Sequence, residues 1–288
     1  MVRSGLVGAA LVAAALQPCL ADDAAAPAQT ADKSAYTLFN PTPKALLREF
    51  SPHRPGKANS ATTLDAGQIE LESDFVNITN DPLNSVHPGT RAMTIGAPIL
   101  YVGLTNFMEL DIGTNLFNFQ SQFDGTSTTK AHGFGDSSVA LGINLFGNEG
   151  GPALGLVPSV KIPTAKDPLG NGYAEYALAV PFAFNIPGNG QAEVEADYGY
   201  IRNDANNGYT SSYGFVANVS YRTPVKHLGV GIELAGSVPM DTRQFSLSLD
   251  PFVTYLVAKN LQIDAGAYLG LNKYTPRAIF YTGFARRF

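Results

Sequence analysis

The sequence predicts an all-β protein, a transmembrane antiparallel up-and-down β-barrel of about 12 strands behind an N-terminal periplasmic extension with a short helix. Three observations predict this fold class. The chain begins with what looks like an export signal, a period-two alternation runs from residue 67 to the C-terminus, and the carboxylates of that region fall on one face of the predicted strands. The composition agrees, with 29 Gly, 13 Tyr and 17 Phe but only 15% charged residues.

Residues 1–21 have the pattern of a signal peptide. Arg3 supplies a positive start, an apolar run follows, and Ala21 is the small residue expected at a cleavage site. The alternative is a lipid anchor on Cys19, which Pro18 disfavours because lipidation usually follows a small residue. Cleavage after Ala21 removes the one cysteine, so the mature chain is predicted to form no disulfide.

Residues 22–66 are predicted to form an N-terminal periplasmic extension or a plug. Residues 22–35 are of low complexity, a short helix can start at Pro43 and run to Phe50, and the remainder is loop-like. The extension carries Arg and Lys side chains, which could meet an acidic lumen and close it. The other reading of this region is a periplasmic tail or a lid on the rim.

Residues 67–288 are predicted to form the barrel. The first strand shows the pattern, since Ile69 and Leu71 alternate with Glu70 and Glu72. Twelve segments of this kind have about the length that a tilted strand needs to cross a bilayer. They are 68–79, 91–103, 107–117, 133–146, 152–163, 173–186, 191–201, 211–223, 228–238, 244–257, 261–271 and 278–288.

The connections between these segments alternate in length. Those at 104–106 and 187–190 are short, whereas those at 80–90 and 118–132 are long. Short periplasmic turns that alternate with longer outer loops are typical of outer-membrane barrels. A soluble β-sandwich, the alternative, predicts no such alternation.

The predicted inward face is acidic. It carries only three basic residues, Lys161, Arg222 and Arg287. A wall of carboxylates around a narrow lumen would favour cations over anions. The alternative is that these acids pair with the few bases or bind the N-terminal segment. The inward carboxylates are Glu70, Glu72, Asp74, Glu109, Asp111, Asp136, Glu175, Glu193, Glu195, Asp197, Glu233, Asp250 and Asp264.

The apolar, outward face ends in aromatic side chains on several strands. Rings at one depth resemble the aromatic girdle at a membrane interface. These residues are Tyr101, Phe184, Tyr221, Tyr255 and Phe288.

The last strand ends as outer-membrane barrels end. Phe288 is the terminal aromatic that barrel-assembly machinery recognises in this class, and Gly283 falls where its C-terminal signal carries glycine. These two residues are predicted to be the assembly signal. Four prolines lie inside predicted strands, where each removes a ladder donor, and they predict bulges or local breaks. They are Pro98, Pro158, Pro181 and Pro251.

The stretch Leu46–Asn77 resembles a bacterial outer-membrane transporter family labelled as the MetA pathway of phenol degradation. His53 departs from that family, where an acidic residue is usual. The resemblance implies an exported barrel that moves small, aromatic or hydrophobic compounds. The matching positions are Arg54, Pro55, Lys57, Asp65, Ala66, Gly67 and Glu70, with a second block at Gly133, Gly135 and Asp136 and a third near the C-terminus.

Enzymatic chemistry finds little support in the sequence. The four histidines, His53, His87, His132 and His227, lie in predicted loops, and none has the sequence context of the outer-membrane phospholipase. We therefore expect no enzyme, no cofactor and no metal site. The net charge of −5 gives no reason to expect a nucleic-acid partner.

The sequence is thus interpreted as a channel in the cell outer membrane that passes small solutes passively through a carboxylate-lined lumen. The alternative is a non-conducting structural or adhesion barrel, and a membrane-embedded enzyme ranks third. The expected partners are the solute, outer-membrane lipid, the assembly machinery and lipopolysaccharide. Basic residues that could meet lipopolysaccharide phosphates are Lys130, Lys166, Arg202, Lys273 and Arg277.

Overall fold

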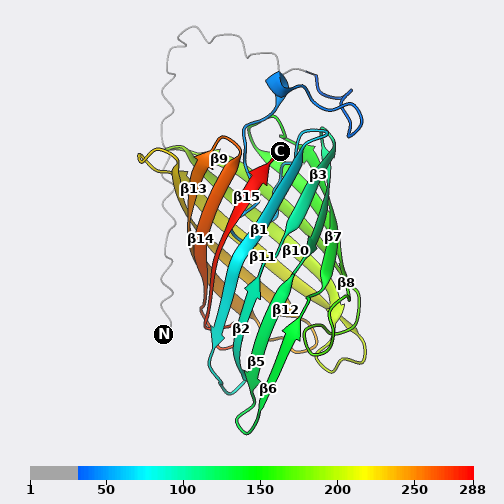
Figure 1. Ribbon diagram of the computed structural model, residues 1–288, viewed down its shortest axis with the longest axis vertical. Helices are drawn as coiled ribbons and strands as arrows, with labels where there is room; N and C mark the ends of the chain where they lie inside the picture. Colours follow the sequence, from blue (N-terminus) through cyan, green and yellow to red (C-terminus); the bar gives the residue numbers. More distant parts are fainter. Residues whose placement is uncertain (1–31) are drawn as a thin grey trace, which may run out of the picture. The chain divides into compact units, whose positions relative to one another are not determined.

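A computed structural model describes residues 32–288, which form a closed antiparallel β-barrel (Figure 1). The predicted signal peptide, residues 1–21, and the start of the extension lie outside the described residues. The strands are β1 (Ile69–Asp81), β2 (Gly89–Ile95), β3 (Ile99–Thr105), β4 (Met108–Thr114), β5 (Phe117–Phe123), β6 (Thr128–Gly133), β7 (Ser137–Phe146), β8 (Ala153–Ile162), β9 (Glu175–Ile186), β10 (Gly190–Arg202), β11 (Tyr209–Arg222), β12 (Leu228–Pro239), β13 (Ser246–Ala258), β14 (Leu261–Gly270) and β15 (Ala278–Arg287).

The predicted number of wall strands is confirmed. Three of them are each divided in two, into β2 and β3, β4 and β5, and β6 and β7, so the 15 strands make a wall of 15 − 3 = 12. Each half of a divided strand pairs with the matching half of its neighbour: β2 with β5 and β5 with β6, β3 with β4 and β4 with β7. The last strand, β15, pairs with β1 and closes the barrel.

The break between β2 and β3 corrects one prediction. It lies at residues 96–98, where Gly96 has φ of 72° and Pro98 cannot donate to a ladder. The alternation changes phase across this break, so Ile95 and Leu100 both face outward and Tyr101 turns inward, only 6% exposed. The placement of Tyr101 in an outer girdle was therefore wrong.

The other three mid-strand prolines interrupt pairing without a change of register. At Pro158 the β7–β8 pairing stops at Ala140–Ser159 and resumes at Ile143–Leu156. Pro181 interrupts β8–β9, and Pro251 interrupts β13–β14. Beside Pro251, Oδ1 of Asp250 accepts a 3.1 Å hydrogen bond from the backbone N–H of Ala267, which replaces a missing ladder acceptor. The expectation of local breaks at proline is thus confirmed.

The long connection predicted at 118–132 is mostly strand. β5 and β6 form a hairpin there with a turn at 124–127, and β2, β5 and β6 reach beyond the rest of the wall at the end away from Phe288 (Figure 1). The alternation of the remaining connections is as expected. Those at 106–107 and 259–260 are tight, whereas the connection 163–174 at the opposite end is long.

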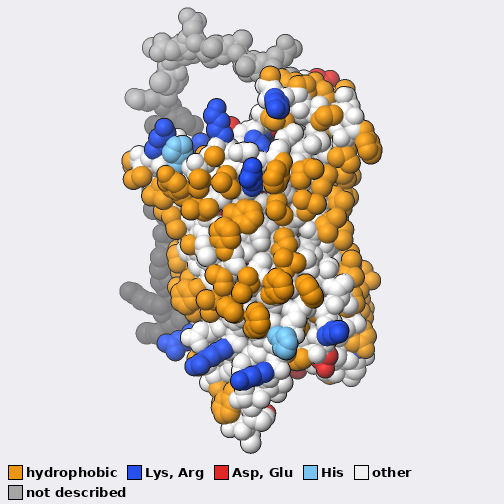
Figure 2. Space-filling view, viewed as in Figure 1, with side chains coloured by type: hydrophobic (Ala, Val, Ile, Leu, Met, Phe, Trp, Pro, Cys, Tyr) orange, Lys and Arg blue, Asp and Glu red, His pale blue; other side chains and the backbone are white. Residues whose placement is uncertain are grey.

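The outer surface of the wall is apolar. Figure 2 shows hydrophobic side chains spread over the middle of the visible wall, with Lys and Arg gathered at its two ends. Phe75 and Phe280 are about half exposed on this surface, and the girdle residues Tyr221, Tyr255 and Phe288 are exposed too. Within residues 32–288, no helix is long and apolar enough to span a membrane.

The extension is ordered largely by contacts with the barrel. Its helix is a single 3-10 turn, Lys44–Leu46, shorter than the predicted one. Pro43 sits just before this turn, in the position expected at a helix start. Beyond the turn, residues 53–64 contact side chains that point into the barrel. We call residues 53–64 the inner segment.

Candidate functional site: the lumen and the inner segment

The inward face of the wall holds the carboxylates that the sequence placed there. Glu70, Glu109, Glu233 and Asp250 are among the largest side chains that are fully buried. Buried carboxylates are costly unless they are paired or accept hydrogen bonds. Their partners therefore show how the lumen is built.

The inner segment follows the inside of the wall. In chain order its polar contacts fall on β1, β14, β12, β10, β7 and β4. The order of strands around the sheet is the same, since β1 is followed by β15, β14 and so on to β7, β4 and β3. The inner segment therefore makes a circuit of the lumen.

Wall carboxylates hold this circuit by its backbone. The N–H of His53 donates to Glu72 at 2.8 Å, and that of Asn59 donates to Glu195 at 2.8 Å. Two further hydrogen bonds of this kind join Lys57 to Glu233 at 2.9 Å and Leu64 to Glu109 at 2.7 Å. The inner segment has neither helix nor strand to satisfy these donors, so charged acceptors on the wall do so.

Arg54 makes the strongest set of contacts. Its Nε and a terminal nitrogen bond the two oxygens of Asp264 at 2.8 and 2.7 Å, and the same terminal nitrogen lies 2.8 Å from Asp74. Asp74 on β1 and Asp264 on β14 are both paired in register with Gly283, so they flank it on either side. A Cβ at Gly283 would clash with the Arg54 side chain, so the glycine leaves the space that the guanidinium occupies. In the structure Gly283, which the sequence predicts as part of an assembly signal, has this packing role.

Lys57 and Asp65, two other residues of the family motif, anchor the extension. Nζ of Lys57 donates to Ser248 at 3.1 Å and lies 4.7 Å from the ring centre of Tyr268. Asp65 is 2% exposed and pairs with Lys33 at 3.0 Å and with Arg48 at 3.1 Å.

Pro55 and Gly67 complete the first motif. Pro55 lines the cavity at the mouth described below. Gly67 has φ of 77°, a left-handed conformation that favours glycine, and its N–H donates to Gly103 of β3 at 2.8 Å. Gly67 thus fixes the direction in which the chain passes from the extension into β1.

The second motif block supports the long loop 163–174. Asp136 accepts a 3.0 Å hydrogen bond from the N–H of Ala165 and lies 3.4 Å from Lys161, whose Nζ is also 2.9 Å from Glu175. Gly135 donates its N–H to Asn115 at 2.9 Å, and Gly133 has φ of 153°. Asp136, Lys161 and Glu175 therefore form an ion-pair cluster on the inward face of the wall.

Arg222 lies at one end of the lumen, among the residues that line the cavity there. Its side chain is 79% exposed and lies 3.4 Å from Glu49 at the mouth near the C-terminus. Phe288 also lies at this mouth, where its N–H donates to Ile69 of β1 at 2.9 Å. We call this end the C-terminal mouth.

Some inward carboxylates carry oxygens without a partner. Among the described residues, both oxygens of Glu70, one of Asp111 and one of Glu193 are buried and accept no hydrogen bond. Asp197 also faces inward, two residues from Glu195, and Asp250 accepts a 2.7 Å hydrogen bond from the Tyr281 hydroxyl.

Two cavities open into the barrel. The larger, about 1310 Å³, lies at the C-terminal mouth and is lined by residues that include His53, Glu193 and Arg287. The second, about 470 Å³, lies along the strand breaks and is lined by residues that include Asn118 and Lys161. The two cavities share no lining residue.

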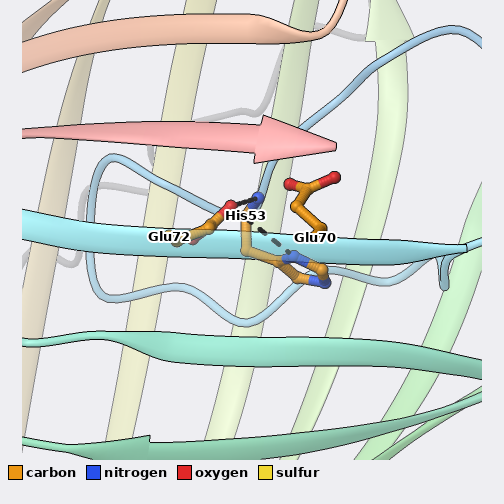
Figure 3. Close-up of side chains that lie close together, drawn as sticks. All are labelled: His53, Glu70 and Glu72. Atoms are coloured by element: carbon orange, nitrogen blue, oxygen red, sulfur yellow. Dashed lines mark hydrogen bonds and ion pairs between the residues drawn. The ribbon is translucent and has the colours of Figure 1, made fainter. Parts of the chain in front are cut away.

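One cluster of potential metal ligands was missed. His53 of the inner segment and Glu70 and Glu72 of β1 place ligand atoms within 4.8 Å of one another (Figure 3). Sequence reasoning treated His53 as a loop residue and the glutamates as lumen wall. Only the path of the inner segment, which has no sequence periodicity, brings them together.

A family model described as "Putative MetA-pathway of phenol degradation" matches residues 52–288. The chain belongs to this family. The match begins within the extension, so the matched range includes Arg54, Lys57 and Asp65.

Solved structures show the same fold. The COG4313 outer membrane channel from Pseudomonas putida F1 superposes with a TM-score of 0.66 at 14% identity, over 81% of this chain and 100% of that chain. The NanC porin aligns over 76% of this chain and 98% of its own at 7% identity, with a TM-score of 0.46. No curated protein sequence matches the chain. The barrel thus has the fold of an outer-membrane channel.

Proposed function

We propose that this protein is an outer-membrane channel that passes small solutes passively, and that the inner segment constricts its lumen. The observation that carries the proposal is the circuit of hydrogen bonds from the inner segment to β1, β14, β12, β10, β7 and β4. A segment held on every side of the lumen occupies space that a solute must otherwise cross.

The lumen is proposed to favour cations. The carboxylates of Asp111 and Glu193 each have a buried oxygen that no described donor satisfies, so negative potential is left along the path. Most of the other inward carboxylates bind the inner segment or Lys161, whereas Asp250 accepts hydrogen bonds from Tyr281 and Ala267 of the wall. Selectivity is therefore assigned to few residues rather than to the whole acidic wall.

The class of solute is inferred from the family description. The family description names phenol degradation, so small aromatic compounds are the first uncharged solutes to test. We propose no catalytic activity, and the proposed location is the outer membrane, with the apolar wall facing lipid.

The test is single-channel current in planar bilayers under a salt gradient, using the full chain purified from outer membranes. Discrete currents with a cation-selective reversal potential are expected. A second protein lacking residues 22–60 should conduct several-fold more, because most of the circuit is gone. Heat-modifiable gel mobility verifies that both barrels are folded.

The outcomes separate the candidates. Current from the protein lacking residues 22–60, with none from the full chain, would mean that the inner segment closes the lumen completely in the resting protein. Silence from both folded proteins would overturn the channel proposal in favour of the non-conducting barrel. Equal conductance of the two would overturn the constriction.

A further inference from the structure

We propose that His53, Glu70 and Glu72 form a site for a divalent transition metal, with Zn²⁺ as the first candidate, that cross-links the inner segment to the barrel wall. The three side chains come from two parts of the chain, and their ligand atoms lie within 4.8 Å of one another. Figure 3 shows the two glutamates projecting from β1 toward the loop that carries His53.

Glu70 provides the observation that points to a ligand. Its side chain is 0% exposed, and neither of its oxygens accepts a hydrogen bond from any described residue. A carboxylate buried in this way is costly unless a cation neutralises it. Since the described residues supply no donor to Glu70, a bound cation is the simplest partner for it.

The hydrogen bonds of His53 orient the ring for coordination. Nε2 lies 2.9 Å from Glu109, a carboxylate that can only accept, so Nε2 carries the hydrogen. Nδ1 is then the nitrogen left to coordinate a metal, which would take the place of its proton; it is buried, makes no hydrogen bond among the described residues, and lies 3.9 Å from Glu72. A carboxylate behind the ligating histidine is the usual arrangement at protein metal sites.

Packing holds this orientation. The His53 ring stacks on Tyr101 with centroids 4.2 Å apart and planes 3° from parallel. The backbone N–H of His53 is fixed separately, by its 2.8 Å hydrogen bond to Glu72. The ring therefore presents Nδ1 toward Glu72, beside Glu70.

The donor set selects the metal. One imidazole nitrogen and two carboxylates suit Zn²⁺ and its neighbours, whereas Ca²⁺ and Mg²⁺ prefer sites built of oxygen alone. Three protein ligands leave a fourth position for water. The present spacing of the donors requires them to close in slightly to reach ordinary metal–ligand distances.

The consequence goes beyond conduction. An ion at this site would join residue 53 to β1 next to the closing strand, so the metal would strengthen the attachment of the inner segment. Metal binding is measured without any current, so this inference can fail while the channel proposal stands, and the reverse.

The test is Zn²⁺ titration by calorimetry of the full chain in detergent, after treatment with a chelator. We expect one Zn²⁺ per chain, with affinity lowered at least about tenfold in Glu70→Gln and by about 10–100-fold in Glu109→Gln. The matched control is Glu193→Gln, an inward glutamate with an unpartnered oxygen outside the cluster, which should bind like wild type.

Two further measurements keep the test decisive. Co²⁺ should give visible absorption bands that Zn²⁺ abolishes, and Zn²⁺ should slow proteolysis of the extension in wild type but not in Glu70→Gln. Gel mobility checks that every variant is folded, and Glu72→Gln replaces Glu70→Gln if that variant fails. Wild type that binds Zn²⁺ no more tightly than a folded glutamate variant would overturn the site and leave a proton shared between the acids.

Discussion

On three strands, two neighbouring inward carboxylates that lie two residues apart differ in what they do. On β1, β4 and β10, the inner segment binds Glu72, Glu109 and Glu195. Their partners in the pairs, Glu70, Asp111 and Glu193, keep buried oxygens without a described donor. Both sets lie on one face and both are carboxylates, so the alternation that places them there cannot tell them apart. The comparison teaches that an acidic lumen can be partly an anchor and partly an electrostatic lining.

We expect the largest loss of stability from removing Arg54, which bonds Asp264 and Asp74 of the wall from the inner segment. Arg54→Ala leaves Asp264, which is 4% exposed, without its bidentate partner, and removing one member of a buried ion pair costs about 3–5 kcal/mol. Urea unfolding in detergent should show this loss, and single-channel conductance should rise as the inner segment loosens.

The control for Arg54→Ala is Arg222→Ala, at the C-terminal mouth. Arg222 is 79% exposed and its ion pair with Glu49 is long, so its removal should leave stability unchanged. Equal effects of the two substitutions would mean that the Arg54 contacts do not hold the inner segment.

An intermediate effect should separate the two members of one pair on β10. Glu195→Ala leaves the N–H of Asn59 without its acceptor, which costs about 1–3 kcal/mol and should speed proteolysis of the extension. Glu193→Ala should leave that proteolysis rate unchanged. If the two variants are digested at the same rate, the division between anchoring and lining carboxylates fails.

The smallest effect concerns selectivity. Asp111→Asn and Glu193→Gln remove lining charge while the anchoring contacts of the inner segment stay in place. The reversal potential under a salt gradient should move toward zero by a few millivolts in each variant and further in the double variant. A shift as large in Asp136→Asn, whose charge is already paired with Lys161, would contradict this assignment.

The wall was predictable because its signals are local. Alternation with period two gave the strands and the inward position of carboxylates such as Glu233, and chain order gave their neighbours. The phase change that turns Tyr101 inward was harder to predict. Gly96 and Pro98 indicate that the strand breaks, but they do not indicate which side chains face inward after the break.

The inner segment could not be predicted in the same way. It has no periodicity, and its contacts join residues far apart in the sequence, such as Arg54 and Asp264. The basic character of the extension indicated that it could meet the acidic wall. Neither the circuit nor the grouping of His53 with Glu70 follows from sequence spacing, because both depend on where the closed barrel brings its strands.

The position of Arg54 over Gly283 has a consequence for the order of assembly. Its two carboxylate partners stand on β1 and β14, on either side of the final strand, so the complete contact exists only after β15 has paired with β1. The complete set of Arg54 contacts is therefore present only in the closed barrel. Opening the barrel between β1 and β15 would break ion pairs of Arg54 as well as the backbone hydrogen bonds between the two strands. Arg54, which precedes β1 in the chain, thus joins the first wall strand to the penultimate one across the strand that closes the barrel.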